Sequence, residues 1–131
     1  MHRWLFAVLV LPGTIVHELS HFIVGLILGG MPSWLSVWPK FDENGSRYGY
    51  VEFRNINWFN AAPIGLSPLI IPFGMWNHFA TTGDTTVLYF LPWLWWAAVP
   101  SLTDWKIASK SLIAYSAIGA GLFILMGLGK I

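Results

Sequence analysis

The chain has 131 residues, of which 56% are hydrophobic and only 10% are charged. About a quarter of the residues of an ordinary soluble domain are charged, so this composition excludes that class and favours a single domain in a lipid bilayer, with a handful of spans of about 20 residues each. The net charge of +1 indicates no nucleic-acid partner, and the absence of cysteine leaves His, Asp and Glu as metal ligands.

The first apolar segment runs from about residue 4 to residue 28 and ends at the stop signal Gly29-Gly30-Met31-Pro32. Within it, Pro12-Gly13 predicts a local kink, because a proline has no amide hydrogen to donate to the preceding turn. The hydroxyl of Thr14 can satisfy the backbone groups that are freed there. We therefore expect one retained membrane-spanning helix.

The same segment contains His17-Glu18-Leu19-Ser20-His21. On a helix, His17 and His21 lie one turn apart on the same face, where their imidazoles can bind one zinc ion. Glu18 lies beside them and can take a proton from a metal-activated water. The alternative is a pair of core histidines held by hydrogen bonds, but ionisable groups at membrane depth are costly and usually functional.

Polar and apolar residues alternate from about residue 33 to residue 56, which is typical of strands. Between the two alternating stretches, Asp42-Glu43-Asn44-Gly45 carries the Asn-Gly pair of tight hairpin turns. We expect a β-hairpin here. It is either an amphipathic lid on the membrane surface or an edge strand that accepts an extended peptide beside the metal.

Three further apolar segments follow, at about residues 60–79, 87–100 and 104–129. The first of them has Pro63, Pro68 and Pro72 and is expected to bend, and the second is short for a full span. The chain is therefore predicted to be a mainly α-helical membrane protein. It has about four transmembrane segments, with the β-hairpin between the first and the second, in a single membrane-embedded core over residues 1–131.

The distribution of basic residues gives an orientation for four crossings. The positive-inside rule places the hairpin side in the cytoplasm and both termini outside. We expect an integral protein of a prokaryotic plasma membrane, with its site nearer the cytoplasmic face. The basic residues on the cytoplasmic side would be Lys40, Arg47, Arg54, Lys106 and Lys110, opposite Arg3 and Lys130.

A third metal ligand is predicted from depth. At about 1.5 Å per residue, His17 lies roughly 20 Å into the bilayer from Trp4, and Pro100 reaches a similar depth from the opposite face. Asp104 would then lie beside the two histidines. This residue is either a metal ligand or the N-cap of the last helix, and it can combine both roles.

The chain resembles the site-2 protease family of intramembrane zinc metalloproteases. The resemblance lies in the motif from His17 to His21, in the hairpin that follows it and in the segment Pro100-Ser101-Leu102-Thr103-Asp104. The resemblance implies that Zn²⁺ is held by His17, His21 and Asp104. It also implies that Glu18 is the general base in hydrolysis of peptide bonds of membrane-associated proteins.

Two features depart from the family pattern. The Asp motif reads Leu102-Thr103-Asp104-Trp105 and lacks the adjacent Leu and the Gly, and the middle helix lacks the family's Asn. Asn60, Ser67 and Asn77 remain candidates for substrate or oxyanion contacts.

Access for water requires a polar cavity, which Thr14, Ser20, Ser101 and Thr103 can line. The sequence shows no regulatory domain, so we expect a regulatory membrane partner or a homo-oligomer. Two other functions stay open: a non-catalytic metal-binding chaperone or subunit of the membrane, and a component of an ion transporter.

Overall fold

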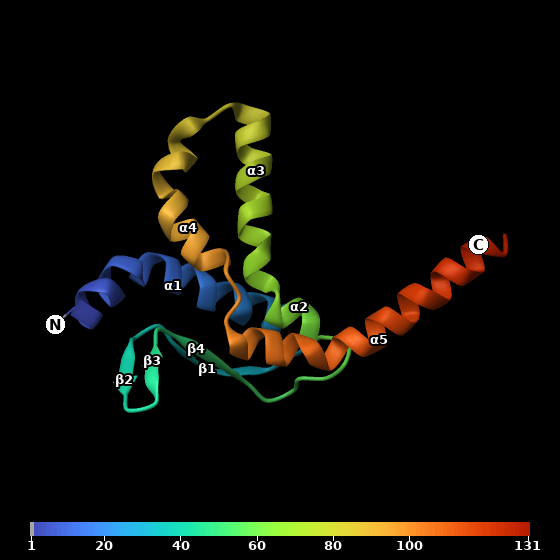
Figure 1. Ribbon diagram of the computed structural model, residues 1–131, viewed down its shortest axis with the longest axis horizontal. Helices are drawn as coiled ribbons and strands as arrows, with labels where there is room; N and C mark the ends of the chain where they lie inside the picture. Colours follow the sequence, from blue (N-terminus) through green and yellow to red (C-terminus); the bar gives the residue numbers. More distant parts are fainter. Residues whose placement is uncertain (1) are drawn as a thin grey trace.

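The computed structural model describes residues 2–131, and most of these are helical (Figure 1). Helices α1 and α5 extend in opposite directions from a central junction. Helices α3 and α4 form an upright hairpin on one side of this junction, and the strands lie on the other side. The elements in chain order are α1 (His2–Ile27), β1 (Pro32–Ser36), β2 (Lys40–Asp42), β3 (Gly45–Arg47), β4 (Tyr50–Phe53), α2 (Ala61–Gly65), the 3₁₀ helix η1 (Ser67–Leu69), α3 (Ile70–Thr82), the 3₁₀ helix η2 (Thr85–Phe90), α4 (Leu91–Ala98) and α5 (Leu102–Gly127).

Among the described residues, two helices, α1 and α5, are long and apolar enough to cross a membrane. The span predicted at residues 60–79 is instead divided into the short helices α2, η1 and α3. The span predicted at residues 87–100 is divided into η2 and α4. Pro68 is the second residue of η1, and Pro92 lies in the first turn of α4. At such positions the missing amide hydrogen is tolerated, but a preceding helix cannot run on through the proline. The prediction of four spans is therefore reduced to two helices of spanning length.

Helix α1 continues through Pro12, and side chains supply donors to the carbonyls around it. The Thr14 hydroxyl donates to the Val10 carbonyl over 3.2 Å, and the indole of Trp93 donates to the Leu9 carbonyl over 2.7 Å. The carbonyl that Pro12 leaves without an amide donor is that of Val8, whereas Thr14 donates to Val10, so the predicted role of Thr14 is not confirmed. The second bond also ties α4 to α1.

The predicted hairpin is present, but as two separate pairs of strands. Strand β1 pairs antiparallel with β4, and β2 pairs antiparallel with β3. The tight turn lies where the sequence predicts it, with the Asp42 carboxyl accepting from the Asn44 amide over 2.9 Å and Gly45 at φ +133°. The ladder is interrupted around Pro39, which is buried between β1 and β2 and has no amide hydrogen to donate.

Two glycines let the helices of the junction approach closely, α1 against α4 and α2 against α5. A Cβ at Gly13 would lie 2.5 Å from the Trp93 carbonyl oxygen, and one at Gly65 would lie 2.6 Å from the carbonyl oxygen of Asp104. Any larger residue would force these backbones apart. The two crossings bring the middle of α1 next to the first turn of α5.

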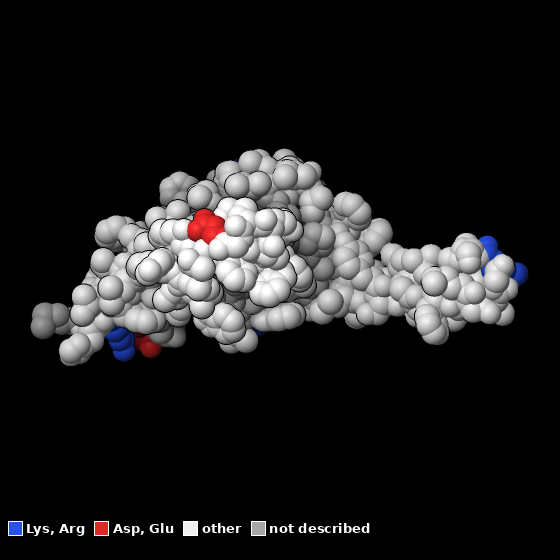
Figure 2. Space-filling view, turned by 90° about the horizontal axis from the view of Figure 1, so that it is seen from above, with Lys and Arg blue, Asp and Glu red and all other residues white. Residues whose placement is uncertain are grey.

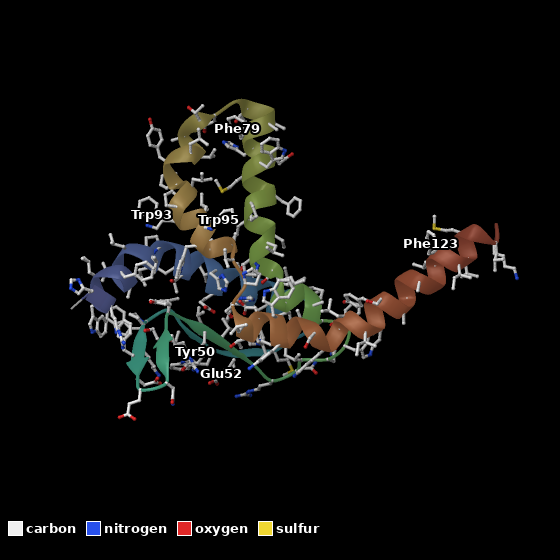
Figure 3. The ribbon with its side chains drawn as sticks, viewed as in Figure 1. Tyr50, Glu52, Phe79, Trp93, Trp95 and Phe123 are labelled. Atoms are coloured by element: carbon white, nitrogen blue, oxygen red, sulfur yellow. The ribbon has the colours of Figure 1, made fainter. Side chains whose placement is uncertain are left out.

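Apart from Ile64, the interior is made of small and polar residues, and most large apolar side chains lie outside. Phe123 is 77% exposed on the half of α5 that extends away from all other elements (Figure 3). Seen onto the tip of the α3–α4 hairpin, most of the surface is uncharged (Figure 2). Among the described residues, the buried apolar ones are Ala7, Ala61, Ala62, Ile64, Ala97, Ala98 and Ala108, and the buried polar ones are Thr14, Glu18, His21, Asn60, Ser67, Asp104 and Ser111.

Candidate metal centre

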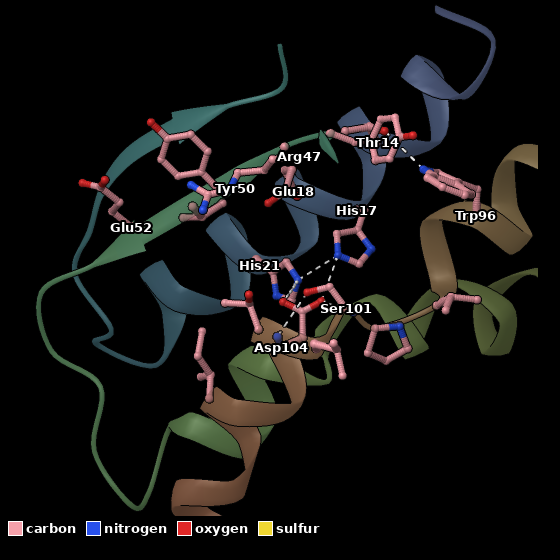
Figure 4. A pocket seen from close by; sticks show the side chains of 18 of the residues that line it. Thr14, His17, Glu18, His21, Arg47, Tyr50, Glu52, Trp96, Ser101 and Asp104 are labelled. Carbon is pink, nitrogen blue, oxygen red and sulfur yellow. Dashed lines mark hydrogen bonds and ion pairs between the residues drawn. The ribbon is translucent and has the colours of Figure 1, made fainter. Parts of the chain in front are cut away.

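Three predicted metal ligands converge at the junction of α1 and α5 (Figure 4). His17 and His21 come from one face of α1, and their Nε2 atoms lie 3.1 Å apart. Asp104, in the first turn of α5, places Oδ2 3.2 Å from Nε2 of His17 and Oδ1 3.0 Å from Nε2 of His21. The three form a buried group that could hold a metal ion.

The other ring nitrogen of each histidine faces a backbone carbonyl. Nδ1 of His17 lies 2.7 Å from the carbonyl oxygen of Ala97, and Nδ1 of His21 lies 2.7 Å from that of Ile64. A carbonyl oxygen only accepts, so each Nδ1 carries the hydrogen and each Nε2 presents its lone pair to the centre. This is the outer arrangement that orients histidine ligands in metal sites.

The donor set fits a metal ion. Two imidazole lone pairs and a carboxylate face one buried point, and all three groups are hydrogen-bond acceptors. A proton between them could form a hydrogen bond between only two of the three groups. A metal ion could bind all three. Ligand atoms of a tetrahedral zinc ion lie about 3.3 Å apart, close to the 3.0–3.2 Å found between these atoms. Three protein ligands leave a fourth position open, as in catalytic zinc sites.

Asp104 also stabilises the start of α5. Its Oδ2 accepts from the amide of Ser101 over 2.6 Å, and its own amide donates to the Ser101 hydroxyl over 3.2 Å. The N-cap is therefore Ser101, and the alternative that placed Asp104 at the N-cap itself is wrong. The Ser-x-x-Asp spacing is a capping-box signal that could have identified this pair.

Glu18 lies on α1 beside the two histidines and is only 7% exposed. Its carboxylate takes part in none of the hydrogen bonds or ion pairs between residues 2 and 131. It faces the hairpin, because Oε1 lies 2.9 Å from the position that a Cβ at Gly49 would occupy. A glycine at position 49 therefore gives the Glu18 side chain its space, and the carboxylate is left without a structural partner.

These groups share a cleft of about 890 Å³ between α1, the hairpin and the connection from α4 to α5. Thr14, Ser101 and Thr103 line this cleft, as predicted. Ser20 does not line it, because its hydroxyl donates to the His17 carbonyl over 2.6 Å. Strand β4 forms one wall and pairs only with β1 among the described residues, so its other edge is available on that wall.

The three predicted substrate-contact residues lie apart from one another. The Asn60 amide is buried and donates to the carbonyls of Leu28 and Asn55 over 3.3 and 2.9 Å, so it holds the chain that follows the hairpin. Asn77 is exposed on α3 and outside the cleft. Ser67 lies closest to the centre, with its hydroxyl 3.1 Å from Nδ1 of His21 and 2.8 Å from the Ile64 carbonyl it donates to.

Sequence reasoning missed the carbonyls of Ala97 and Ile64, because a backbone oxygen leaves no mark in the side-chain pattern. It also missed Gly49, whose importance depends on how closely the hairpin packs on α1. As a whole, the arrangement could hold a metal ion beside the Glu18 carboxylate, which has no hydrogen-bond partner in the described part of the chain. Comparison of the chain with family models, curated proteins and solved structures found no match.

Proposed function

We propose that this chain is an intramembrane zinc metalloendopeptidase that hydrolyses peptide bonds of membrane-associated proteins. One observation carries the proposal: His17 and His21 from one helix and Asp104 from another converge beside Glu18 in a cleft walled by an edge strand. The two motifs that resemble the site-2 protease family supply these same residues.

Zinc is the proposed metal because the ligands are two imidazoles and a carboxylate, a set found in catalytic zinc sites with one open position. When bound, zinc would polarise the scissile carbonyl and lower the pKa of a water molecule. His17 and His21 are held in the ligating orientation by the carbonyls of Ala97 and Ile64. Asp104 adds a negative charge that favours a dication.

Glu18 is the proposed general base. With no hydrogen-bond partner among residues 2–131, its carboxylate can accept a proton from the attacking water and then deliver it to the leaving amine. Gly49 keeps the space in front of this carboxylate clear of side-chain atoms. A peptide bond in an extended segment exposes its carbonyl for attack, and β4 offers backbone groups that can hold such a segment in place.

A membrane setting is supported by the distribution of apolar residues. Large apolar side chains such as Phe73 and Phe123 are 76% and 77% exposed, and the interior is built from alanines and polar groups. Water would make such a surface unfavourable, whereas lipid would stabilise it. Helices α1 and α5 have the length and apolarity to cross a bilayer.

The test uses the purified full chain in detergent, with zinc and an unfolded protein as substrate. Glu18→Gln should keep the bound zinc and lower cleavage by about 10²- to 10⁴-fold, which is the usual contribution of a general base. His17→Ala should lose the zinc. Glu43→Gln is the matched control, because it makes the same substitution at the exposed hairpin turn and should leave both quantities unchanged.

Zinc content is read by elemental analysis, and cleavage by mass spectrometry of the products. Full cleavage by Glu18→Gln would contradict the proposed mechanism. A wild-type chain that binds zinc but never cleaves, and whose cellular role survives the Glu18→Gln change, would instead indicate a non-catalytic metal-binding subunit.

A further inference from the structure

Two cations of the hairpin are gathered on one aromatic ring. Lys40 and Arg47 are direct cross-strand partners in β2 and β3. The ammonium of Lys40 lies 5.6 Å from the ring centroid of Tyr50, and the guanidinium carbon of Arg47 lies 5.4 Å from it. We refer to Lys40, Arg47 and Tyr50 as the basic cluster. The ring attracts both cations through its quadrupole without neutralising either charge.

Within residues 2–131, no acidic side chain forms an ion pair with Lys40 or Arg47. The ion pairs in this part of the chain all involve histidines. Asp42 and Glu43 lie in the same hairpin, but neither forms an ion pair with these cations. Like charges that face each other across two strands are destabilising, so a ligand anion at this point would relieve the repulsion.

Two of the three members of the basic cluster line the cleft that holds the proposed metal centre. Arg47 and Tyr50 line this cleft together with Glu18 and Asp104. Figure 4 shows Arg47 beside Tyr50, and Glu52 lies further along β4, the strand of Tyr50. A peptide that lay extended along β4 in this cleft would therefore lie next to Arg47 and Tyr50.

We infer that the basic cluster is a subsite for an acidic side chain of the peptide substrate, and this inference rests on the proposed peptidase function. The planar guanidinium of Arg47 can pair with a carboxylate through two N–H groups while it stacks on Tyr50. Glu52 would disfavour a second acidic residue two positions along. The cleft would then prefer one acidic residue at a fixed distance from the scissile bond.

The experiment measures cleavage-site preference with the full zinc-loaded chain in neutral detergent. The cleavage sites in an unfolded protein identify the substrate position where Asp and Glu are enriched. A matched pair of peptides with Glu or Gln at that position then gives a ratio of kcat/KM values. We expect wild type to prefer Glu by about three- to fivefold, as expected for a partly exposed ion pair, and the preference to fall as salt rises.

Arg47→Gln should remove the preference for Glu, and Arg47→Lys should restore part of it. Lys110→Gln, which removes an exposed cation of α5 outside the cleft, should leave the ratio unchanged. A ratio that persists in Arg47→Gln, or cleavage without any acidic preference, would overturn this inference alone.

Two further outcomes are informative. If the Arg47→Gln effect appeared only in vesicles of anionic lipid, and equally for both peptides, the basic cluster would bind lipid headgroups and the inference would be wrong. If the zinc-loaded wild type cleaved no substrate at all, the proposed function would fail and the inference with it.

Discussion

The junction and the outer parts of the molecule are built on opposite principles. At the junction, helices touch through glycine and alanine, and each polar group that is fully buried has a hydrogen-bond partner among the described residues. The α3 helix has no buried residue, and the half of α5 that carries Phe123 touches no other element (Figure 3). The stability of the junction therefore depends on close packing within the chain, and the stability of the outer helices depends on the medium around them.

Because of this difference, metal binding at the junction and membrane integration of the outer helices can be tested separately. Close packing restricts the positions of His17, His21 and Asp104, and chemistry at a metal requires side chains held to within about 0.5 Å. The exposed apolar arms require only an apolar environment. Substitutions at the junction should therefore change metal binding, and substitutions on the arms should change membrane integration.

Asp104→Ala should have the largest effect. It removes a proposed metal ligand and a capping side chain together, so we expect zinc affinity to fall by about 100-fold or more, since even groups that only orient ligands contribute about 10- to 100-fold. Helix α5 should also lose about 1 kcal/mol from the missing cap. Competition with a chelator measures the first effect, and thermal unfolding of the metal-free protein measures the second.

Asp104→Asn is the matched variant for this experiment. Its side-chain oxygen can still accept from the Ser101 amide, so the cap is kept while the charge is lost. Zinc affinity should fall and the metal-free stability should stay near that of wild type. If Asp104→Ala bound zinc as tightly as wild type, Asp104 would be a capping residue only.

Phe123→Asp tests the other region. A carboxylate in place of an aromatic residue disfavours insertion by about 3–4 kcal/mol at the centre of a span and by less at Phe123, which lies in the last turns of α5. We expect the membrane-integrated fraction of the chain to fall, measured by alkaline extraction. Phe123→Leu is the control and should integrate like wild type. Equal integration of Phe123→Asp would contradict a lipid-facing position for this half of α5.

Gly65→Ala should have a smaller effect, at the contact of α2 with α5. The added Cβ would lie 2.6 Å from the Asp104 carbonyl oxygen and 3.0 Å from the Ala108 amide, and backbone atoms cannot rotate away. We expect a loss of about 1–3 kcal/mol in the free energy of unfolding and weaker zinc binding.

Gly74→Ala provides the comparison for Gly65→Ala. Its Cβ would meet nothing within 4 Å on helix α3, so the substitution should be neutral or stabilising by up to about 1 kcal/mol through helix propensity. Both proteins are followed by thermal unfolding in detergent. Equal stability of the two variants would show that the contact of α2 with α5 is not tight.

Much of the junction could be predicted from the sequence, because its signals are local. The spacing of His17 and His21 on a helix, the stop after residue 28 and the Asn-Gly turn each follow from a few neighbouring residues. Asp104 was found from depth, although the depth argument assumed four spans. Its place in the structure depends instead on the close crossing at Gly65.

The parts that could not be predicted depend on contacts between distant elements. Apolar runs such as 60–79 have the composition of a span, but proline placement divides them into short helices, and single-sequence hydropathy does not resolve where such a helix ends. In the same way, Asn60 carries the chemistry of a substrate ligand, yet its amide is used by two backbone carbonyls. Packing between distant elements therefore determines both where these helices end and which groups the Asn60 amide contacts.

The smallest predicted effect concerns Asp84, an exposed acid at the tip of the α3–α4 hairpin whose partners are all local. The Thr86 hydroxyl and the Thr86 amide both donate to it, and His78 lies 3.2 Å away, so the pKa of Asp84 is lowered from 3.8 to about 2. The folded pKa is the lower one. The ionised cap therefore stabilises the tip above about pH 3.8, and this stabilisation is lost as the pH falls toward 2.

Thr86→Val removes the largest of these contributions and should move the pKa of Asp84 back toward 3.8, whereas Thr85→Val, whose hydroxyl bonds to no residue between 2 and 131, should not. Carboxyl NMR titration measures both midpoints. Zinc content should be the same in both variants, because this acid is held by neighbours in sequence and shares no contact with the ligands. A wild-type midpoint near 3.8 would mean that the tip does not hold this cap, and a change in zinc content would mean that the tip and the junction are coupled.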